Sequence, residues 1–124
     1  MHKLLIVDDE KMIRLGIKHA INWSELGIEK VYTAASAREA MDIINKENPN
    51  IMLTDISMTE MTGLDLIKYA RNIYSEKEMR IIVLTGYDSF DYARQCLKMK
   101  VQNFLLKPID EEELKINIRT EINV

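Results

Sequence analysis

Three apolar runs in this 124-residue chain each end in charged residues that could do chemistry together. In chain order, these residues are Asp8 with Asp9, Asp55, and Lys107. If the three runs are neighbouring parallel strands, their charged groups meet at the carboxyl edge of one sheet, where open α/β sheets place ligands. Clustered carboxylates repel each other unless a cation or a proton neutralises them, and hard oxygen ligands of this kind suit Mg²⁺. The residues therefore predict a magnesium site and a further group for the metal to hold.

Strands and helices alternate along the rest of the chain. Strands are predicted at about 3–7, 30–34, 51–53, 80–84 and 102–106, and the run at 51–53 is apolar without alternation, as in a strand covered on both faces. Apolar stripes predict helices at about 11–21, 37–48 with Ser36 as N-cap, 63–74, 90–100 and 111–123. In the first of these helices, one face is expected to carry Ile13, Gly16, Ile17, Ala20 and Ile21. Trp23 is expected to cover the end of that helix.

This alternation predicts an α/β fold of the (βα)5 kind, a doubly wound five-stranded parallel sheet between two helical layers. Of the two common strand orders, 2-1-3-4-5 places Asp8 and Asp9 beside Asp55. The clustered acids make this order the expected one.

Composition sets the broad class of protein. The length fits one domain, and the formal charge of −3 with a pI near 5.4 argues against nucleic-acid binding by this segment. Cys96 is the single cysteine and allows no internal disulfide, which is typical of a reducing compartment. No apolar run approaches the roughly twenty residues of a membrane span, and no signal-peptide pattern precedes Leu4. We expect a cytoplasmic domain.

Several of these residues also have a purely structural interpretation. Asp9 could cap the first helix, Thr85 could simply end the fourth strand, and Phe104 could be an ordinary core residue. The residue types alone leave these alternatives open.

The motifs together resemble those of a known family. Val7-Asp8-Asp9-Glu10, Asp55 with Met58 and Gly63, Thr85-Gly86, and Lys107-Pro108 follow each other at suitable intervals. In this respect the chain resembles the receiver domain of bacterial two-component response regulators, a flavodoxin-like fold, over nearly its whole length.

The resemblance implies that Asp55 accepts a phosphoryl group from a sensor histidine kinase. It implies that Mg²⁺ is the cofactor, held directly by Asp9, mainly through water by Asp8, and by Asp55 and the backbone carbonyl of Ser57. Lys107 would neutralise phosphoryl oxygens as a long-reaching point charge.

The resemblance also implies a conformational switch. Thr85 would donate its hydroxyl to the phosphoryl group and move toward it, while Phe104 turns inward behind it. A cis peptide is expected between Lys107 and Pro108. The face formed by the fourth helix, the fifth strand and the last helix would respond and control an output domain.

Residues 22–28 and 86–93 resemble the subfamily whose receiver precedes an AraC-type helix-turn-helix domain. Residues 1–124 are therefore expected to be the N-terminal receiver domain of a longer DNA-binding response regulator that controls transcription. Homodimerisation on phosphorylation is an expected partner state. The domain would assist its own phosphorylation and dephosphorylation without being an enzyme for a separate substrate.

Two alternatives belong to other classes of protein. One is a scaffold that binds partners without phosphorylation. The other is a Mg²⁺-dependent phosphatase with an aspartate nucleophile, a class that usually carries a second aspartate where Ser57 stands here.

Overall fold

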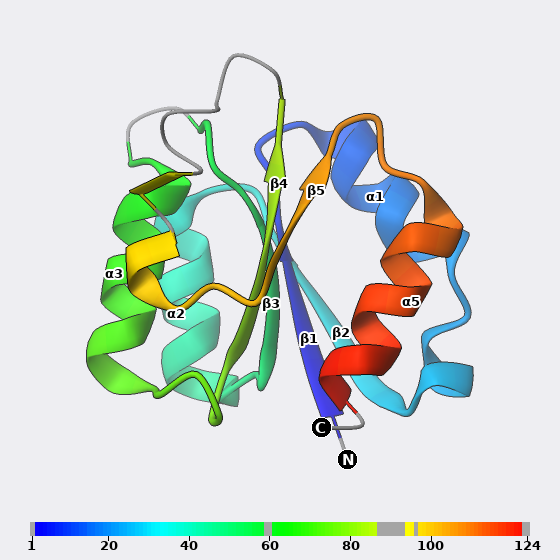
Figure 1. The fold of residues 1–124 in the computed structure, drawn as a ribbon, viewed down its shortest axis with the longest axis horizontal. Coiled ribbons are helices and arrows are strands. Elements are labelled where there is room, and N and C mark those ends of the chain that lie inside the picture. Colours follow the sequence, from blue (N-terminus) through cyan, green and yellow to red (C-terminus); the bar gives the residue numbers. More distant parts are fainter. Residues whose placement is uncertain (1, 59–60, 87–93, 96, 123–124) are drawn as a thin grey trace.

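The computed structural model describes residues 2–58, 61–86, 94–95 and 97–122. Its centre is a five-stranded sheet in the order β2-β1-β3-β4-β5, with every neighbouring pair parallel. The strands are β1 (His2–Val7), β2 (Ile28–Ala34), β3 (Ile51–Asp55), β4 (Arg80–Thr85) and β5 (Asn103–Leu106). The predicted fold and strand order are confirmed (Figure 1).

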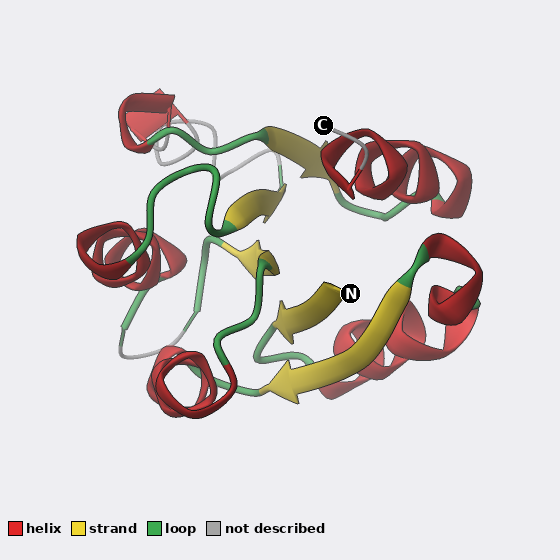
Figure 2. Cartoon of the chain, turned by 90° about the horizontal axis from the view of Figure 1, so that it is seen from below, coloured by secondary structure: helices red, strands yellow, loops and turns green. Residues whose placement is uncertain are grey.

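Helices cover both faces of this sheet. They are α1 (Lys11–Ala20), α2 (Ala37–Glu47), α3 (Gly63–Ile73) and α5 (Glu111–Ile122), with short 3-10 turns η1 (Trp23–Leu26) and η3 (Leu97–Met99). α1 and α5 lie on one side, and α2 and α3 on the other (Figures 1 and 2). Of the helix expected at 90–100, residues 90–93 and 96 fall outside the described residues; residues 94 and 95 are α-helical, and residues 97–99 form a 3-10 turn rather than an α-helical end. None of the described helices is long and apolar enough to cross a bilayer.

The two apolar cores come from the alternation of side chains along the strands. In β1, Leu5 and Val7 belong to the cluster under α2 and α3, whereas Leu4 and Ile6 belong to the cluster under α1 and α5. All four are completely buried, because β1 lies between β2 and β3 and helices cover both faces. This explains why the run reads as continuously apolar rather than alternating.

The face of α1 departs in part from the expectation. Ile17 and Ile21 are buried as predicted, but Gly16 and Ala20 are exposed. The physical reason is that α5 does not close over them, so they line a groove between the two helices. Trp23 is buried and donates its indole N–H to the Lys18 carbonyl at 3.0 Å, so it covers the end of α1 as expected.

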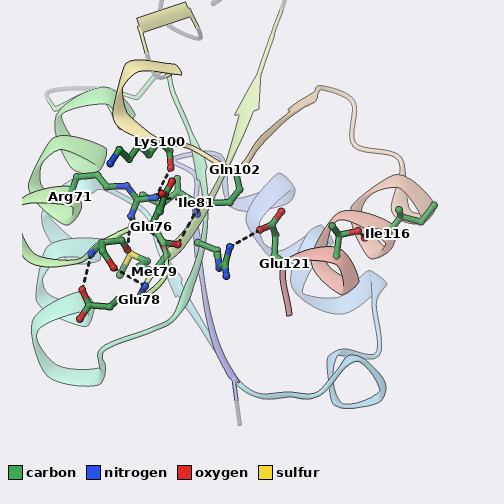
Figure 3. Close-up of polar contacts among 12 residues, drawn as sticks. Arg71, Glu76, Glu78, Met79, Ile81, Lys100, Gln102, Ile116 and Glu121 are labelled. Carbon is green, nitrogen blue, oxygen red and sulfur yellow. Dashed lines mark hydrogen bonds and ion pairs between the residues drawn. The ribbon is translucent and has the colours of Figure 1, made fainter. Parts of the chain in front are cut away.

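Arg71 ties α3 to the segment that leads into β5 (Figure 3). Its guanidinium donates to the backbone carbonyls of Met79 at 2.8 Å, Met99 at 2.9 Å and Lys100 at 2.8 Å. The fork geometry of a guanidinium allows one side chain to satisfy several carbonyls at once. The end of α3 and the chain before β5 are therefore held in a fixed relation.

Lys100 adopts φ +57°, in the left-handed region where a Cβ is unfavourable and glycine is favoured. We expect Lys100→Gly to raise the free energy of unfolding by up to about 1 kcal/mol, because the contact with Arg71 uses only the backbone carbonyl. Chemical denaturation measures this. Asn48 is the matched control: it has φ +50°, but asparagine tolerates this region and its side chain accepts a hydrogen bond from Tyr74. Asn48→Gly should not stabilise the domain. If both variants raised the free energy of unfolding equally, the explanation by left-handed strain at Lys100 would be contradicted.

Candidate functional site

The carboxyl ends of β1, β3 and β5 bring the predicted residues together. Val7 is paired with Thr54, so Asp8 and Asp55 are the next residues on two adjacent strands. Lys107 follows β5 and donates its backbone N–H to the Thr85 carbonyl at 2.8 Å. The Lys107–Pro108 peptide is cis, as the resemblance implied. The structure thus assembles residues that lie up to a hundred positions apart in the sequence.

Lys107 connects the acidic side chains. Its Nζ lies 3.0 Å from Oδ2 of Asp8, 3.1 Å from Oδ2 of Asp55 and 4.0 Å from Oε1 of Glu10. Asp8 is completely buried and Asp55 is only 4% exposed. Burying two carboxylates is costly without a counter-ion, and the Lys107 ammonium supplies one to both.

The crowding of charges at the site shifts the pKa values of Asp55 and Lys107. Burial raises the pKa of the Asp55 carboxyl, the hydrogen bond from Lys107 lowers it, and the nearby Asp8 charge raises it, with a net rise. Burial alone would lower the pKa of the Lys107 ammonium, but its contacts with Asp8 and Asp55 raise it above its ordinary value. A single lysine therefore only partly compensates the burial and mutual repulsion of the carboxylates.

The backbone around Asp55 is tightly built. Ser57 donates its backbone N–H to Oδ1 of Asp55 at 3.2 Å, and the Thr54 hydroxyl donates to the Asp55 carbonyl at 2.9 Å. Gly63, at the start of α3, packs directly on this turn: a Cβ there would lie 2.1 Å from the Asp55 carbonyl oxygen. The main chain thus orients Oδ1 of this carboxylate, while the Lys107 ammonium contacts Oδ2.

The acids suit a divalent cation. Carboxylate oxygens of Asp8, Asp9 and Glu10 lie within 4.8 Å of one another. Oδ2 of Asp8 is buried and forms an ion pair with the Lys107 ammonium at 3.0 Å, but no described residue satisfies it with a hydrogen bond. An under-satisfied buried carboxylate beside further hard oxygen ligands fits Mg²⁺.

Asp9 lies one residue before the N-cap position of α1. Glu10 occupies the N-cap position, and its backbone N–H donates to Oδ1 of Asp8 at 2.9 Å. Asp9 therefore lies in the turn before the helix.

The two expected switch residues lie on neighbouring strands. Thr85 is the last residue of β4, 8% exposed, and its hydroxyl donates to the Gly86 carbonyl at 3.0 Å. Phe104 pairs with Val83 one strand away and packs, half-buried, against the core under α2 and α3. Their placement is compatible both with a switch role and with ordinary packing.

Sequence reasoning missed two residues at the site. Glu10 joins the acidic cluster and approaches Lys107, and Arg14 donates to the Asp8 carbonyl at 2.8 Å. The three consecutive acids at 8–10 were a visible signal for Glu10. Nothing in the pattern singled out Arg14, because its contact crosses the turn between β1 and α1.

Comparisons with known proteins agree with this geometry. Residues 4–119 match the family model of the response regulator receiver domain. The chain is 34% identical over 116 residues to the transcriptional regulatory protein HptR of Staphylococcus aureus, covering 94% of this chain and 44% of HptR. An uncharacterized response regulatory protein of Staphylococcus epidermidis is 35% identical over 115 residues, covering 93% of this chain and 44% of that protein.

Solved structures are similar over nearly the whole chain. The REC domain of AraT, a response regulator from Geobacillus stearothermophilus, superposes with a TM-score of 0.87 at 36% identity, covering 98% of this chain and 95% of that one. A two component transcriptional regulator AraC from Clostridium phytofermentans gives 0.90 at 30% identity, covering 99% and 94%. The fold, the acidic strand ends and these similarities agree, and the chain belongs to the response regulator receiver domain family.

Proposed function

We propose that this receiver domain is a phosphorylation switch whose acceptor is Asp55. The observation that carries the proposal is the buried pair of Asp8 and Asp55 carboxylates held by one ammonium, with an acidic turn beside it. The partner that supplies the phosphoryl group is a sensor histidine kinase.

In the proposed reaction, a carboxylate oxygen of Asp55 attacks phosphorus. A P–O bond forms, the P–N bond to the kinase histidine breaks, and the electron pair of that bond returns to the imidazole nitrogen. Phosphoryl transfer depends mainly on positioning and charge stabilisation. The Ser57 N–H and the packing of Gly63 position Asp55, and Lys107 places positive charge next to it.

The residues that would hold Mg²⁺ are Asp8, Asp9, Asp55 and the Ser57 carbonyl. The bound ion would neutralise the oxygens of the transferring phosphoryl group. Glu10 lies close enough to Asp8 and Asp9 to add negative charge to this site.

The proposed readout is a two-state change, because phosphorylation adds about −1.5 to −2 charges and strong acceptors at one point. Thr85 and Phe104 would carry it to the face formed by the fourth helix expected at 90–100, β5 and α5. The chain spans 44% of the length of HptR, whose name marks it as a transcriptional regulator. We infer that residues 1–124 likewise act in the cytoplasm as the N-terminal receiver of a longer protein with a DNA-binding output domain.

The test is incubation with a small phosphodonor, with and without Mg²⁺, followed by intact-mass measurement. We expect one phosphoryl adduct that needs Mg²⁺ and is absent in Asp55→Asn. Asp42→Asn, at an exposed position of α2, is the matched control and should be modified like the natural chain. No adduct under any condition would favour the scaffold alternative, and turnover of the donor without an adduct would favour the phosphatase.

A further inference from the structure

A cavity of about 450 Å³ lies between the last turn of α3, the loop that follows it and the segment before β5. Its lining contains a single acid, Glu76, and four cations: Arg71, Lys77, Lys98 and Lys100. The chain as a whole carries a formal charge of −3, so this cavity is opposite in sign to the rest of the domain. Its volume lies in the range of about 300 to 1,000 Å³ that is usual for small-molecule sites.

Arg71 supplies a half-buried positive charge to this cavity (Figure 3). Burial lowers the pKa of its guanidinium, Glu76 raises it and Arg80 lowers it, with a net fall, but a guanidinium remains charged. Among the described residues it forms no ion pair. Its five hydrogen bonds all go to uncharged acceptors, the carbonyls of Ser75, Met79, Met99 and Lys100 and the side-chain oxygen of Gln102.

The three lysines of the cavity also lack a counter-ion. None of their ammonium groups lies within 4.0 Å of a carboxylate oxygen in the part of the chain that the structure describes. Two nearby acids are engaged elsewhere: Glu78 accepts a hydrogen bond from the Ser75 N–H at 2.9 Å, and Glu121 pairs with Arg80 at 3.5 Å. The cations therefore repel each other with only Glu76 to offset them, and a bound anion would relieve that repulsion.

The cations differ in how they can contact a ligand. Arg71 has five N–H groups and uses them in its five hydrogen bonds, so it acts through its charge alone. The lysine ammonium groups have free donors. Because they come from the loop after α3 and from residues 98–100, an anion whose charge is spread over several groups suits them better than a single compact ion.

Tyr74 gives the cavity an aromatic wall. Its hydroxyl donates to the side chain of Asn48 and to the Ile44 carbonyl, both at the end of α2. These hydrogen bonds hold the ring in place. A fixed aromatic face can stack with a nucleobase of any type.

We propose that this cavity binds a small molecule with a chain of two or more phosphate groups, either a nucleotide or an inorganic polyphosphate. The three lysines would donate charge-assisted hydrogen bonds to the phosphate oxygens, and Arg71 would add its charge. The ligand would then bridge the end of α3 and the segment before β5. No residue of the acidic site lines this cavity, so the proposal does not rest on phosphorylation of Asp55.

Amide NMR titration at physiological ionic strength, with a chelator in place of Mg²⁺, tests the proposal. The ligands are ATP, tripolyphosphate, adenosine and sulfate. We expect saturable shifts of the amides of residues 74–77 and 98–100, with a dissociation constant below about 1 mM for ATP, for tripolyphosphate or for both. Adenosine and sulfate should bind far more weakly. Tighter binding of ATP than of tripolyphosphate would assign the site to a nucleotide, and equal binding would assign it to the phosphate chain alone.

Lys98→Glu should raise the dissociation constant by at least about tenfold, because it replaces an attractive charge with a repulsive one. Lys30→Glu is the matched control, since it makes the same charge change at an exposed position of β2, at the opposite edge of the sheet from β5. It should change the constant by less than about twofold, because salt screens charges at that distance. Lys100→Gly should weaken binding several-fold although it is expected to stabilise the domain, which separates loss of binding from loss of folding.

Several results would overturn the proposal. They are the absence of saturable binding, equal binding of sulfate, shifts confined to residues 8–10 and 55–57, and equal effects of Lys98→Glu and Lys30→Glu. A glutamate-rich peptide that shifts residues 98–100 when the polyphosphates do not would assign the cavity to an acidic protein segment instead. Failure of the phosphodonor experiment would contradict the proposed function and leave polyphosphate binding unaffected.

Discussion

Gly63→Ala is expected to lower the free energy of unfolding by about 3 kcal/mol, the upper end of the range associated with overpacking that forces the backbone to move. A Cβ at this position would lie 2.1 Å from the Asp55 carbonyl oxygen and 2.7 Å from Cα of Ile56. Both are main-chain atoms, so no side-chain rotation relieves the overlap. Urea denaturation of the two proteins measures the loss.

The same substitution should impair phosphorylation in the protein that remains folded, because relief of the overlap displaces the turn that carries Asp55. Gly16→Ala is the matched control, since Gly16 lies in a helix and its Cβ would meet nothing within 4 Å. Alanine should stabilise that helix by up to about 1 kcal/mol. If Gly63→Ala is as stable as the natural chain, the prediction that α3 packs too closely on the turn after β3 to admit a Cβ is contradicted.

Lys107→Ala is expected to reduce stability in the absence of Mg²⁺ by about 3 kcal/mol near neutral pH. The substitution leaves the buried carboxylates of Asp8 and Asp55 without their shared counter-ion. Phosphorylation of Asp55 should slow by about a hundredfold or more, because a positive charge next to the transferring group is lost. Thermal unfolding and the rate of adduct formation measure the two effects.

The pH dependence follows from the direction of the pKa shift. Burial and the Asp8 charge raise the pKa of Asp55 in the folded protein, while the Lys107 hydrogen bond lowers it, so removing Lys107 raises it further. When a carboxyl has a higher pKa in the folded than in the unfolded protein, the folded protein becomes less stable as the pH rises through the folded-state pKa. The deficit of Lys107→Ala should therefore be largest at neutral pH and shrink as the pH falls into the carboxyl range.

Lys115→Ala is the matched control, because Lys115 pairs with the exposed Glu112 at 3.4 Å. An exposed pair of this kind contributes less than about 1 kcal/mol. Added Mg²⁺ should restore part of the stability of Lys107→Ala and none of the small change in Lys115→Ala. A pH-independent deficit in Lys107→Ala would contradict the role of Lys107 as counter-ion.

The fold was predictable because its signals are local or chemical. Continuous apolar runs identified the buried strands, and the need to bring Asp8 and Asp55 together selected the strand order that the structure has. The acidic cluster was predictable for the same reason: Asp8 and Lys107 directly follow strands, Asp55 is the last residue of one, and parallel strands end at one edge.

The remaining features depend on contacts between distant segments. Gly16 and Ala20 are exposed because of the position of α5. The 3.6-residue apolar pattern of α1 carries no information about that position. Lys100 adopts its left-handed conformation in a segment whose carbonyls are held by Arg71 from α3. Glu10 is the N-cap because of the turn in which Asp8 accepts a hydrogen bond from the Glu10 N–H, not because of residue preference at the cap alone.

The two ends of the described chain lie close together at the amino-terminal edge of the sheet, opposite to the edge that carries the acidic site. His2 begins β1, Ile122 ends α5, and both line one small cavity with Asn50 and Arg80 (Figure 1). A domain with adjacent ends can be inserted into an exposed loop of a host protein through short linkers. Inserted in this way, the chain would present Asp55 away from the junction, which makes it a suitable module for engineered sensors.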